Sequence, residues 1–364
     1  MINNKPSVCP CKPTSRASMK IIKSSLLLFL FLLVSATGQN PAQAPPAQPK
    51  GMVALKMDNG DLDPEEVYLV AVTKDSVAFK FNEGDAQPEI KKRAEVDSIF
   101  LYDPADYLEA LDLYEGRKYA EAMNAFIKVK NRYMRMFPGL PNNPGVMASY
   151  YELECLRKLN DLEGLRVALQ KFKKGNLTRK VPLQQIEIYL LWDAIRANLN
   201  QEALKIVEQY EGKRLPGHQR AQIAYCHGRA LESLSKPPHE ILLAYQTAIT
   251  ADAGASQSLV RDAILRSLEI LNNDQEVKDA KRTFDESDGQ ELIRGFTKVM
   301  EAAGLCSMFQ IQLATGEPLP QKYRHFLSYT PDRIQAIAEG TDTTKKNGDN
   351  QKQPEKPKPG EKGK

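Results

Sequence analysis

A spacing of small and apolar residues recurs five times between residues 104 and 290, and this repeat constrains the fold more than any other feature. In the first unit Tyr119, Ala122, Phe126 and Val129 follow one another at intervals of three, four and three, which places them on one face of a helix. The later positions equivalent to Ala122 follow at intervals of 43, 38, 38 and 39 residues, and they are Leu165, Ala203, Ile241 and Ala280. One amphipathic helix pair leaves its apolar stripe in water, whereas stacked pairs share a continuous core. The repeat therefore predicts a mainly α-helical chain of about five antiparallel helix pairs.

The segments "YEGRKYAEAMNAF" and "HGRALESL" carry the repeat most fully, and they resemble the tetratricopeptide repeat. That family pairs two antiparallel helices and places a small residue in the first helix, a position occupied here by Ala110 and Gly228. The spacing in this chain is longer than the roughly 34 residues usual for the family, and a related helical-pair solenoid gives nearly the same pattern. The resemblance implies an α-solenoid over residues 104–290.

The same resemblance implies a concave groove lined by the first helix of each pair. Its register points eight residues of this chain into the groove, namely Tyr107, Tyr114, Tyr150, Arg157, Trp192, Arg196, Tyr225 and Arg229. Tyr, Trp and Arg are the residue types that most often contribute binding energy at protein interfaces. Packing between helices is the alternative role for each of them, and an error of one residue in register would reassign the whole set.

Residues 51–103 follow a different period, and they predict a small β domain. Apolar and polar residues alternate there, as in "DSVAFKF", where Val77, Phe79 and Phe81 share one face. The segments "DNGD" and "NEGD" supply turn residues between the alternating runs. We expect four or five short strands. Their pattern resembles that of small Sm-like and SH3-like β-barrels, so a barrel-like domain is expected before the helices.

The N-terminal 38 residues are typical of a secretory signal peptide. Five basic residues and no acidic one precede or flank the apolar run "LLLFLFLLV", which is followed by small residues. This run is about half of the roughly 20 residues that span a bilayer, so no transmembrane anchor is expected after cleavage. A signal peptide that began at Met19 would have a more typical length. Residues 39–50 form a Pro/Ala/Gln linker. These features predict an exported bacterial protein of the periplasm or cell envelope.

The C-terminal part divides into a capping segment and a tail. Residues 291–314 predict a helix that covers the last apolar stripe of the repeats and contacts "YRHFLSY" at 323–329. Residues 291–340 together form this capping helix and its extension. Residues 341–364 are rich in Lys, Pro and Gly and carry no large apolar side chain, so a disordered tail is expected there.

The sequence lacks the motifs that carry catalysis or cofactor binding. No GxSxG, HExxH, P-loop, GxGxxG or CxxC motif is present, and the four His residues share no ligand spacing. We therefore expect no catalytic residue, no metal site and no small-molecule cofactor. Cys155, Cys226 and Cys306 lie in apolar helical patterns and are expected to be buried, although export leaves one disulfide possible. Without the leader, 45 basic residues face 46 acidic ones (50 in the whole chain minus five), which argues against nucleic-acid binding.

These observations predict a non-enzymatic, protein-binding scaffold. Its groove would bind a peptide or partner helix in a cell-envelope assembly. The alternative is an accessory protein that binds cell wall or carbohydrate through the β domain, with Tyr68 and Tyr102 as exposed aromatics. A third interpretation is a structural spacer with no stable partner.

Overall fold

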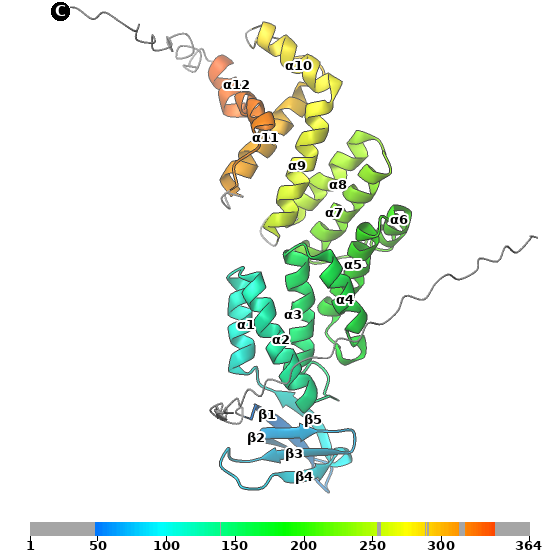
Figure 1. Ribbon diagram of the computed structural model, residues 1–364, viewed down its shortest axis with the longest axis vertical. Coiled ribbons are helices and arrows are strands. Elements are labelled where there is room, and N and C mark those ends of the chain that lie inside the picture. The colour runs from blue at the N-terminus through cyan, green and yellow to red at the C-terminus, as the bar shows by residue number, and fades with distance from the viewer. Residues whose placement is uncertain are drawn as a thin grey trace, which may run out of the picture. The chain divides into compact units, whose positions relative to one another are not determined.

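The computed structural model describes residues 48–138, 140–252, 256–287, 289, 291–312 and 317–338. The expected signal peptide, nearly all of the linker and the expected tail lie outside these residues. Within the described part, the chain is mainly helical and has one small antiparallel sheet near its N-terminus (Figure 1). The coarse division into a strand-rich segment followed by helices is as predicted.

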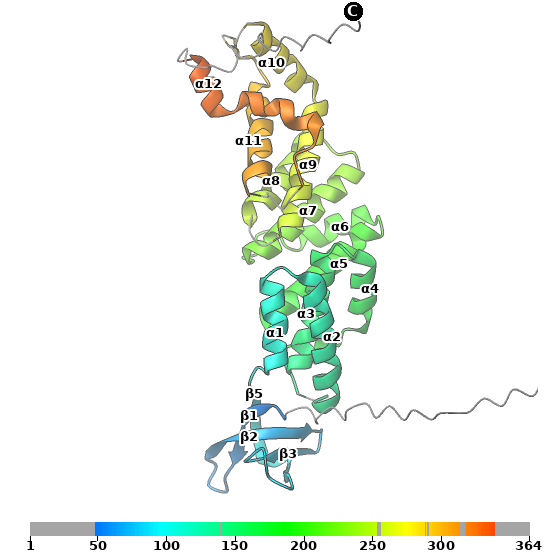
Figure 2. The ribbon, with the colours of Figure 1, turned by 60° about the vertical axis from the view of Figure 1, so that its left-hand side comes forward.

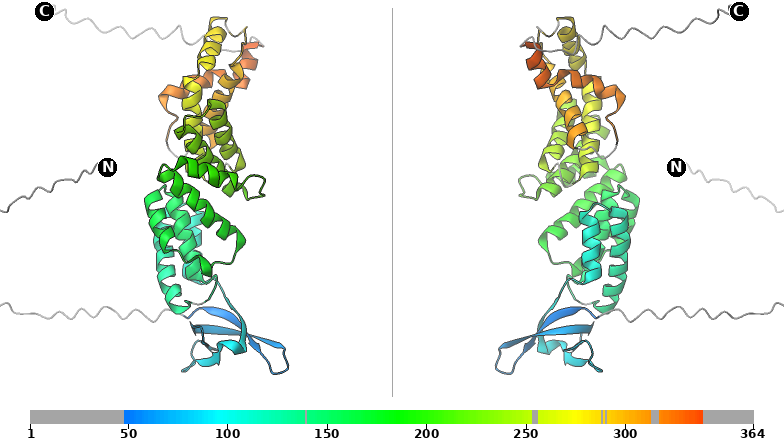
Figure 3. Two further views of the ribbon diagram at one scale, coloured as in Figure 1. Left: turned by 90° about the vertical axis from the view of Figure 1, so that its right-hand side faces the viewer. Right: turned by 90° about the vertical axis from the view of Figure 1, so that its left-hand side faces the viewer.

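Five strands form the sheet, in the order β4-β3-β2-β1-β5. They are β1 (Lys50–Lys56), β2 (Leu62–Val72), β3 (Ser76–Lys80), β4 (Glu89–Lys92) and β5 (Val96–Leu101), with the short 3-10 helix η1 (Arg93–Glu95) before β5. Every described pairing is antiparallel, and β1 pairs with both β2 and β5. Figure 3 shows the sheet from two opposite sides. Val77 and Phe79 are fully buried on one face, as their alternation predicts, whereas Phe81 lies beyond β3 and is exposed.

Ten α-helices follow in five consecutive pairs. They are α1 (Ala105–Glu115) with α2 (Tyr119–Met136), α3 (Pro144–Lys158) with α4 (Leu162–Lys171), α5 (Lys180–Arg196) with α6 (Asn200–Glu208), α7 (Gly217–Ser233) with α8 (Pro238–Ala251), and α9 (Gln257–Asn273) with α10 (Gln275–Glu286). A 3-10 turn, η2 (Lys174–Asn176), links α4 to α5. The second helix of each pair contains one of the five equivalent positions of the repeat, from Ala122 in α2 to Ala280 in α10.

The turns inside the first four pairs share one backbone conformation. Two residues after each first helix ends, the chain has a positive φ, at Arg117, Asn160, Asn198 and Ser235. The next amide then donates back to a carbonyl five residues earlier, as in Lys118 to Leu113 and Leu199 to Ala194. This is the Schellman arrangement, which satisfies carbonyls at the end of a helix. It reverses the chain within a few residues, so the second helix packs back on the first.

The residues that define the repeat lie in the core. Ala122, Leu165, Ala203, Ile241 and Ala280 are all buried. Each helix from α1 to α9 packs on the helix that follows it. First helices of neighbouring pairs also contact one another, since α7 packs on both α5 and α9. One cluster of buried apolar residues runs from the sheet to the last helices. The core is therefore continuous across the pairs.

A further α-helix, α11 (Phe296–Gln312), follows the pairs, and η3 (Gln321–Tyr329) and α12 (Pro331–Ala338) come after it. Helix α11 packs against α9, α10 and η3 (Figure 2), so the predicted contact with residues 323–329 is present. Cys155, Cys226 and Cys306 are buried free thiols, as expected for small apolar residues. Among the described helices, none has the length and apolar character required to cross a membrane.

Candidate functional site

Four of the eight predicted groove residues line one cavity. Arg157 comes from α3, Trp192 from α5, and Tyr225 and Arg229 from α7. The start of α9 closes the cavity with Arg261, Asp262 and Arg266. We call this cavity of about 420 Å³ the arginine pocket, and its remaining lining residues are Asn160, Ser256, Ser258, Leu259 and Leu265. First helices of four neighbouring pairs thus contribute to one site.

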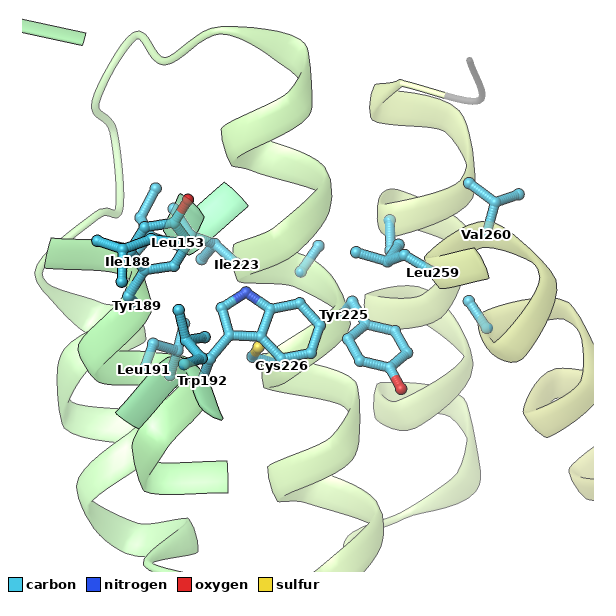
Figure 4. Packing of buried hydrophobic residues seen from close by; sticks show 14 of the residues in the cluster. Leu153, Ile188, Tyr189, Leu191, Trp192, Ile223, Tyr225, Cys226, Leu259 and Val260 are labelled. Carbon is cyan, nitrogen blue, oxygen red and sulfur yellow. The ribbon is translucent and has the colours of Figure 1, made fainter. Parts of the chain in front are cut away.

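The apolar wall of the arginine pocket is a stacked aromatic pair. The rings of Trp192 and Tyr225 lie 5.4 Å apart between centroids at an interplanar angle of 29° (Figure 4). The Trp192 indole Nε1 donates to Gln222 Oε1 at 3.0 Å, and Gln222 in turn exchanges hydrogen bonds with Gln185. These polar contacts hold α5 against α7 and fix the indole. Trp192 therefore serves both packing and pocket lining.

A buried ion pair lies at the α3 side of the pocket. The Arg157 Nη2 donates to Glu154 Oε2 at 3.2 Å, and both side chains are almost fully buried. Glu154 also accepts hydrogen bonds from the hydroxyls of Tyr114 and Tyr189. Burial by itself raises the pKa of Glu154, but the nearby Arg157 charge and the Tyr189 hydroxyl outweigh it, so its pKa lies below the ordinary value. Glu154 is thus held as the carboxylate.

The α7 and α9 sides of the pocket are joined by a chain of polar contacts. Arg229 Nη1 donates to the Tyr225 hydroxyl at 3.0 Å, and that hydroxyl donates to Asp262 Oδ2 at 2.5 Å. Arg266 forms ion pairs with Asp262 and with Glu232. Arg229 contacts no carboxylate among the residues that the structure describes. Its positive charge is therefore the least compensated of those in the chain of contacts.

A second cavity adjoins the arginine pocket and shares Ser258 and Arg261 with it. We call this cavity of about 250 Å³ the lysine pocket, because Lys158 lines it together with Arg117, Tyr119 and Gln257. The Lys158 ammonium lies 5.8 Å from the centroid of the Tyr119 ring. Burial, followed by repulsion from Arg157, lowers the pKa of Lys158 to about 8.

The other four predicted residues lie outside both pockets. Tyr107 and Tyr150 are buried, and with the partly buried Tyr114 they pack around Tyr151. Arg196 forms ion pairs with Asp193 and with Glu163. Three of these four thus pack in the helical core, and Arg196 takes part in a partly exposed network.

A third cavity, larger than the arginine and lysine pockets, lies elsewhere. It measures about 960 Å³ and is lined by α2, α3 and α4, with apolar residues such as Met123, Val167 and Phe172 beside lysines. None of the eight predicted residues lines it. Its charged lining includes the Lys130–Glu152 ion pair, in which the two charges compensate each other. The arginine pocket is the better candidate because four of the eight predicted residues line it and because Arg229 there has no carboxylate partner among the described residues.

Sequence reasoning missed the residues that α9 and the turn before α4 contribute. Arg261 precedes the buried Ile264, and Arg266 lies between Ile264 and the buried Leu268. Only the contact of α9 with α7 shows which side of α9 turns toward the pocket. Lys158 was missed although it follows Arg157 directly. A search for basic residues near the ends of first helices would have found Lys158 as well.

The side chains of the arginine pocket can bind a ligand through charge, hydrogen bonds and aromatic contact. No group of three or more potential metal ligands occurs among the described residues. The pocket lining includes guanidinium groups, hydroxyls, the Asn160 amide, the Asp262 carboxylate and an aromatic wall, and guanidinium groups in particular bind carboxylate and phosphate groups. No family model, no curated protein and no solved structure matches this chain.

Proposed function

We propose that this chain is an exported, non-enzymatic scaffold that binds a peptide segment or a partner helix across the first helices of its pairs. The observation that carries the proposal is that Arg157, Trp192, Tyr225 and Arg229, chosen from sequence, line one cavity. Aromatic and Arg side chains at the centre of a concave site are the usual anchors of a protein interface. The charged residues around them would set specificity.

We further infer that the five pairs stack as a tetratricopeptide-like solenoid and that the sheet is barrel-like. The packing of each helix on the next, with first helices touching across pairs, supports the solenoid. The pairing of β1 with both β2 and β5, with bulges in β5 and β2, supports a curled sheet. In this arrangement the first helices face one side, which makes a continuous binding surface.

The proposed location is the bacterial periplasm or cell envelope, and the support for it is the leader-like sequence of residues 1–38. A scaffold there would hold a protein partner of an envelope assembly. The long repeat array and the separate small sheet give such a chain two surfaces on which partners can be arranged.

The test compares two Arg→Gln variants on the same helix. Arg229→Gln changes the pocket, whereas Arg220→Gln changes an exposed residue near the start of α7. Tagged full chains are used to capture proteins from envelope extracts. We expect Arg229→Gln to deplete specific partners about tenfold, in line with the loss of one charged hydrogen bond, and Arg220→Gln to match the wild type. Equal capture profiles for all three chains would refute the proposal.

A second candidate function rests on an exposed apolar patch of the sheet. Phe100 is 60% exposed, its ring packs edge-on against Tyr102, and Met52 lies opposite it in the register of β1 and β5. Tyr68 and Tyr102 are only partly exposed. Aromatic side chains on an exposed face suit binding to sugar rings. Retention on peptidoglycan that Phe100→Ser abolishes would favour this function, and retention that survives deletion of residues 51–103 would remove it.

A further inference from the structure

The arginine pocket and the lysine pocket are adjacent and both are lined by basic side chains. They share the side chains of Arg261 and Ser258. Six basic side chains line the two pockets, and they are Arg117, Arg157, Lys158, Arg229, Arg261 and Arg266. Asp262 is the only acidic side chain of that lining. An excess of this kind in a half-enclosed site attracts anions, because low-dielectric walls focus the field.

Part of this positive charge is already used within the protein. Arg157 pairs with Glu154, and Arg266 pairs with Asp262 and Glu232. Arg229, by contrast, is hydrogen-bonded to the neutral Tyr225 hydroxyl. Arg157 is 95% buried, yet its Nε finds no hydrogen-bond partner among the described residues. A buried donor without a partner is unfavourable, so an acceptor from a ligand would be stabilising here.

The edge shared by the two pockets already contacts a carboxylate. Arg261 forms an ion pair with Glu317, whose side chain is largely exposed. The shared arginine is thus within reach of an oxyanion that approaches from solvent. Neutral donors surround the same position, since Ser256, Ser258 and Asn160 line the arginine pocket. Guanidinium, hydroxyl and amide donors together are the groups that bind carboxylate and phosphate oxygens.

We propose that the two pockets together bind a ligand that carries two linked oxyanion groups. One group would contact Arg157 and Arg229 in the arginine pocket, and the other would contact Lys158 and Arg117 in the lysine pocket, with Arg261 between them. Such groups occur as neighbouring acidic side chains of a peptide or as phosphates of a small molecule. Binding of an acidic peptide would specify the partner of the proposed scaffold and rests on that function. Binding of a small molecule with phosphate groups is independent of the scaffold function.

The test uses Trp192 as a built-in reporter, because it is the only Trp of the chain and lines the arginine pocket. The full chain is titrated at low ionic strength with orthophosphate, pyrophosphate, a peptide with two adjacent Glu residues and the matched Gln peptide. We expect saturable changes in Trp192 fluorescence. Pyrophosphate should bind at least about tenfold more tightly than orthophosphate. Its second phosphate group is covalently linked to the first, so it is presented to the second pocket at a high effective concentration. The Glu peptide should bind and the Gln peptide should not if the natural source is a protein.

Two variants and one control assign the binding to the proposed residues. Arg229→Gln should weaken every oxyanion probe about tenfold, and Lys158→Gln should reduce pyrophosphate affinity to that of orthophosphate. Arg220→Gln, an exposed site on the same helix, should change nothing. Thermal melting of each variant verifies that it is folded.

Three results would overturn the inference: no saturable binding of any probe, equal affinity for orthophosphate and pyrophosphate, or equal losses in Arg229→Gln and Arg220→Gln. The two proposals fail separately. If the probes do not bind but Arg229→Gln still loses partners in extracts, the scaffold function stands and the oxyanion site does not. If the probes bind and capture is unchanged, the site stands and the scaffold function does not.

Discussion

At the scale of single residues, the ion pair between Glu154 and Arg157 decides which substitutions can probe the pocket. Removing one member of a buried ion pair leaves the other charge uncompensated and costs about 3–5 kcal/mol. Trp192→Ala would likewise leave a cavity beside a buried hydrogen bond. Arg229 is neither part of a buried ion pair nor a core packing residue, since it is partly exposed and lacks a carboxylate partner among the described residues. It is therefore the residue whose change reports on binding rather than on folding.

Lys158 gives the site a pH dependence. Its surroundings are Arg157, Glu154, Arg117 and Asp252, with Tyr119, Arg261 and the half-buried His218 close by. Burial and then Arg157 lower the pKa of Lys158 to about 8, so the ammonium is charged at pH 7 and becomes neutral as the pH rises through that value. We expect pyrophosphate affinity to fall between pH 7 and pH 9.

The control for the pH prediction is Lys158→Gln, in which this fall should be absent. Titrations of Trp192 fluorescence at several pH values measure the effect. An affinity that rises with pH, or an equal fall in Lys158→Gln, would contradict the assigned role of Lys158.

Gly228 provides a stability prediction at a close helix contact. A Cβ built at Gly228 would lie 2.5 Å from Cε1 of Tyr245, a fully buried ring. Because the ring has no room to move, Gly228→Ala should lower the free energy of unfolding by about 1–3 kcal/mol. In Gly304→Ala the new Cβ meets no atom within 4 Å, and better helix propensity should stabilise that variant by up to about 1 kcal/mol. Urea unfolding of both variants gives the two values, and equal signs would contradict this packing.

At the scale of elements, the turn after each first helix is the recurring device. Ser235 adopts a left-handed conformation with a φ of 52° and is exposed, which costs a residue with a Cβ about 1–2 kcal/mol. Ser235→Gly should therefore raise the free energy of unfolding by about 0.5–1 kcal/mol, after the greater freedom of Gly in the unfolded chain is subtracted. The same change at the exposed helical residue Ser233 should lower it by a similar amount. Thermal melting distinguishes them, and a loss of stability in Ser235→Gly would refute the turn assignment.

The elements also show how far the sequence alone could go. The helical character of residues 104–290 was predictable from apolar periodicity, and the structure places Asn160 and Asn198 in the turns after first helices. The pocket was predictable only in part. Apolar spacing identifies which face of a helix is buried, as Ile264 and Leu268 show, but it does not distinguish a side that packs on a neighbour from one that lines a cavity. Tyr107 and Tyr150 lie in the core for that reason, while Arg261 and Arg266 were overlooked.

At the scale of the whole molecule, the account rests on one buried core that passes through successive helix pairs. The apolar cluster includes Ala122 near its start, Trp192 in its middle and Phe309 near its end. The arginine pocket depends on that continuity, because its residues come from α3, α5, α7 and α9 and lie 109 positions apart at the extremes (266 minus 157). Loss of stacking between any two of these pairs would take the site apart.

Urea unfolding of the full chain tests this central claim most directly, with helix content followed by circular dichroism and the pocket by Trp192 fluorescence. Trp192 belongs to α5, and its side chain packs against α7 in the middle of the buried core. If the pairs share that core, the two signals should change together with one midpoint. A Trp192 transition that is complete at a lower urea concentration, while most of the helical signal persists, would show that the pairs unfold independently and would contradict the account.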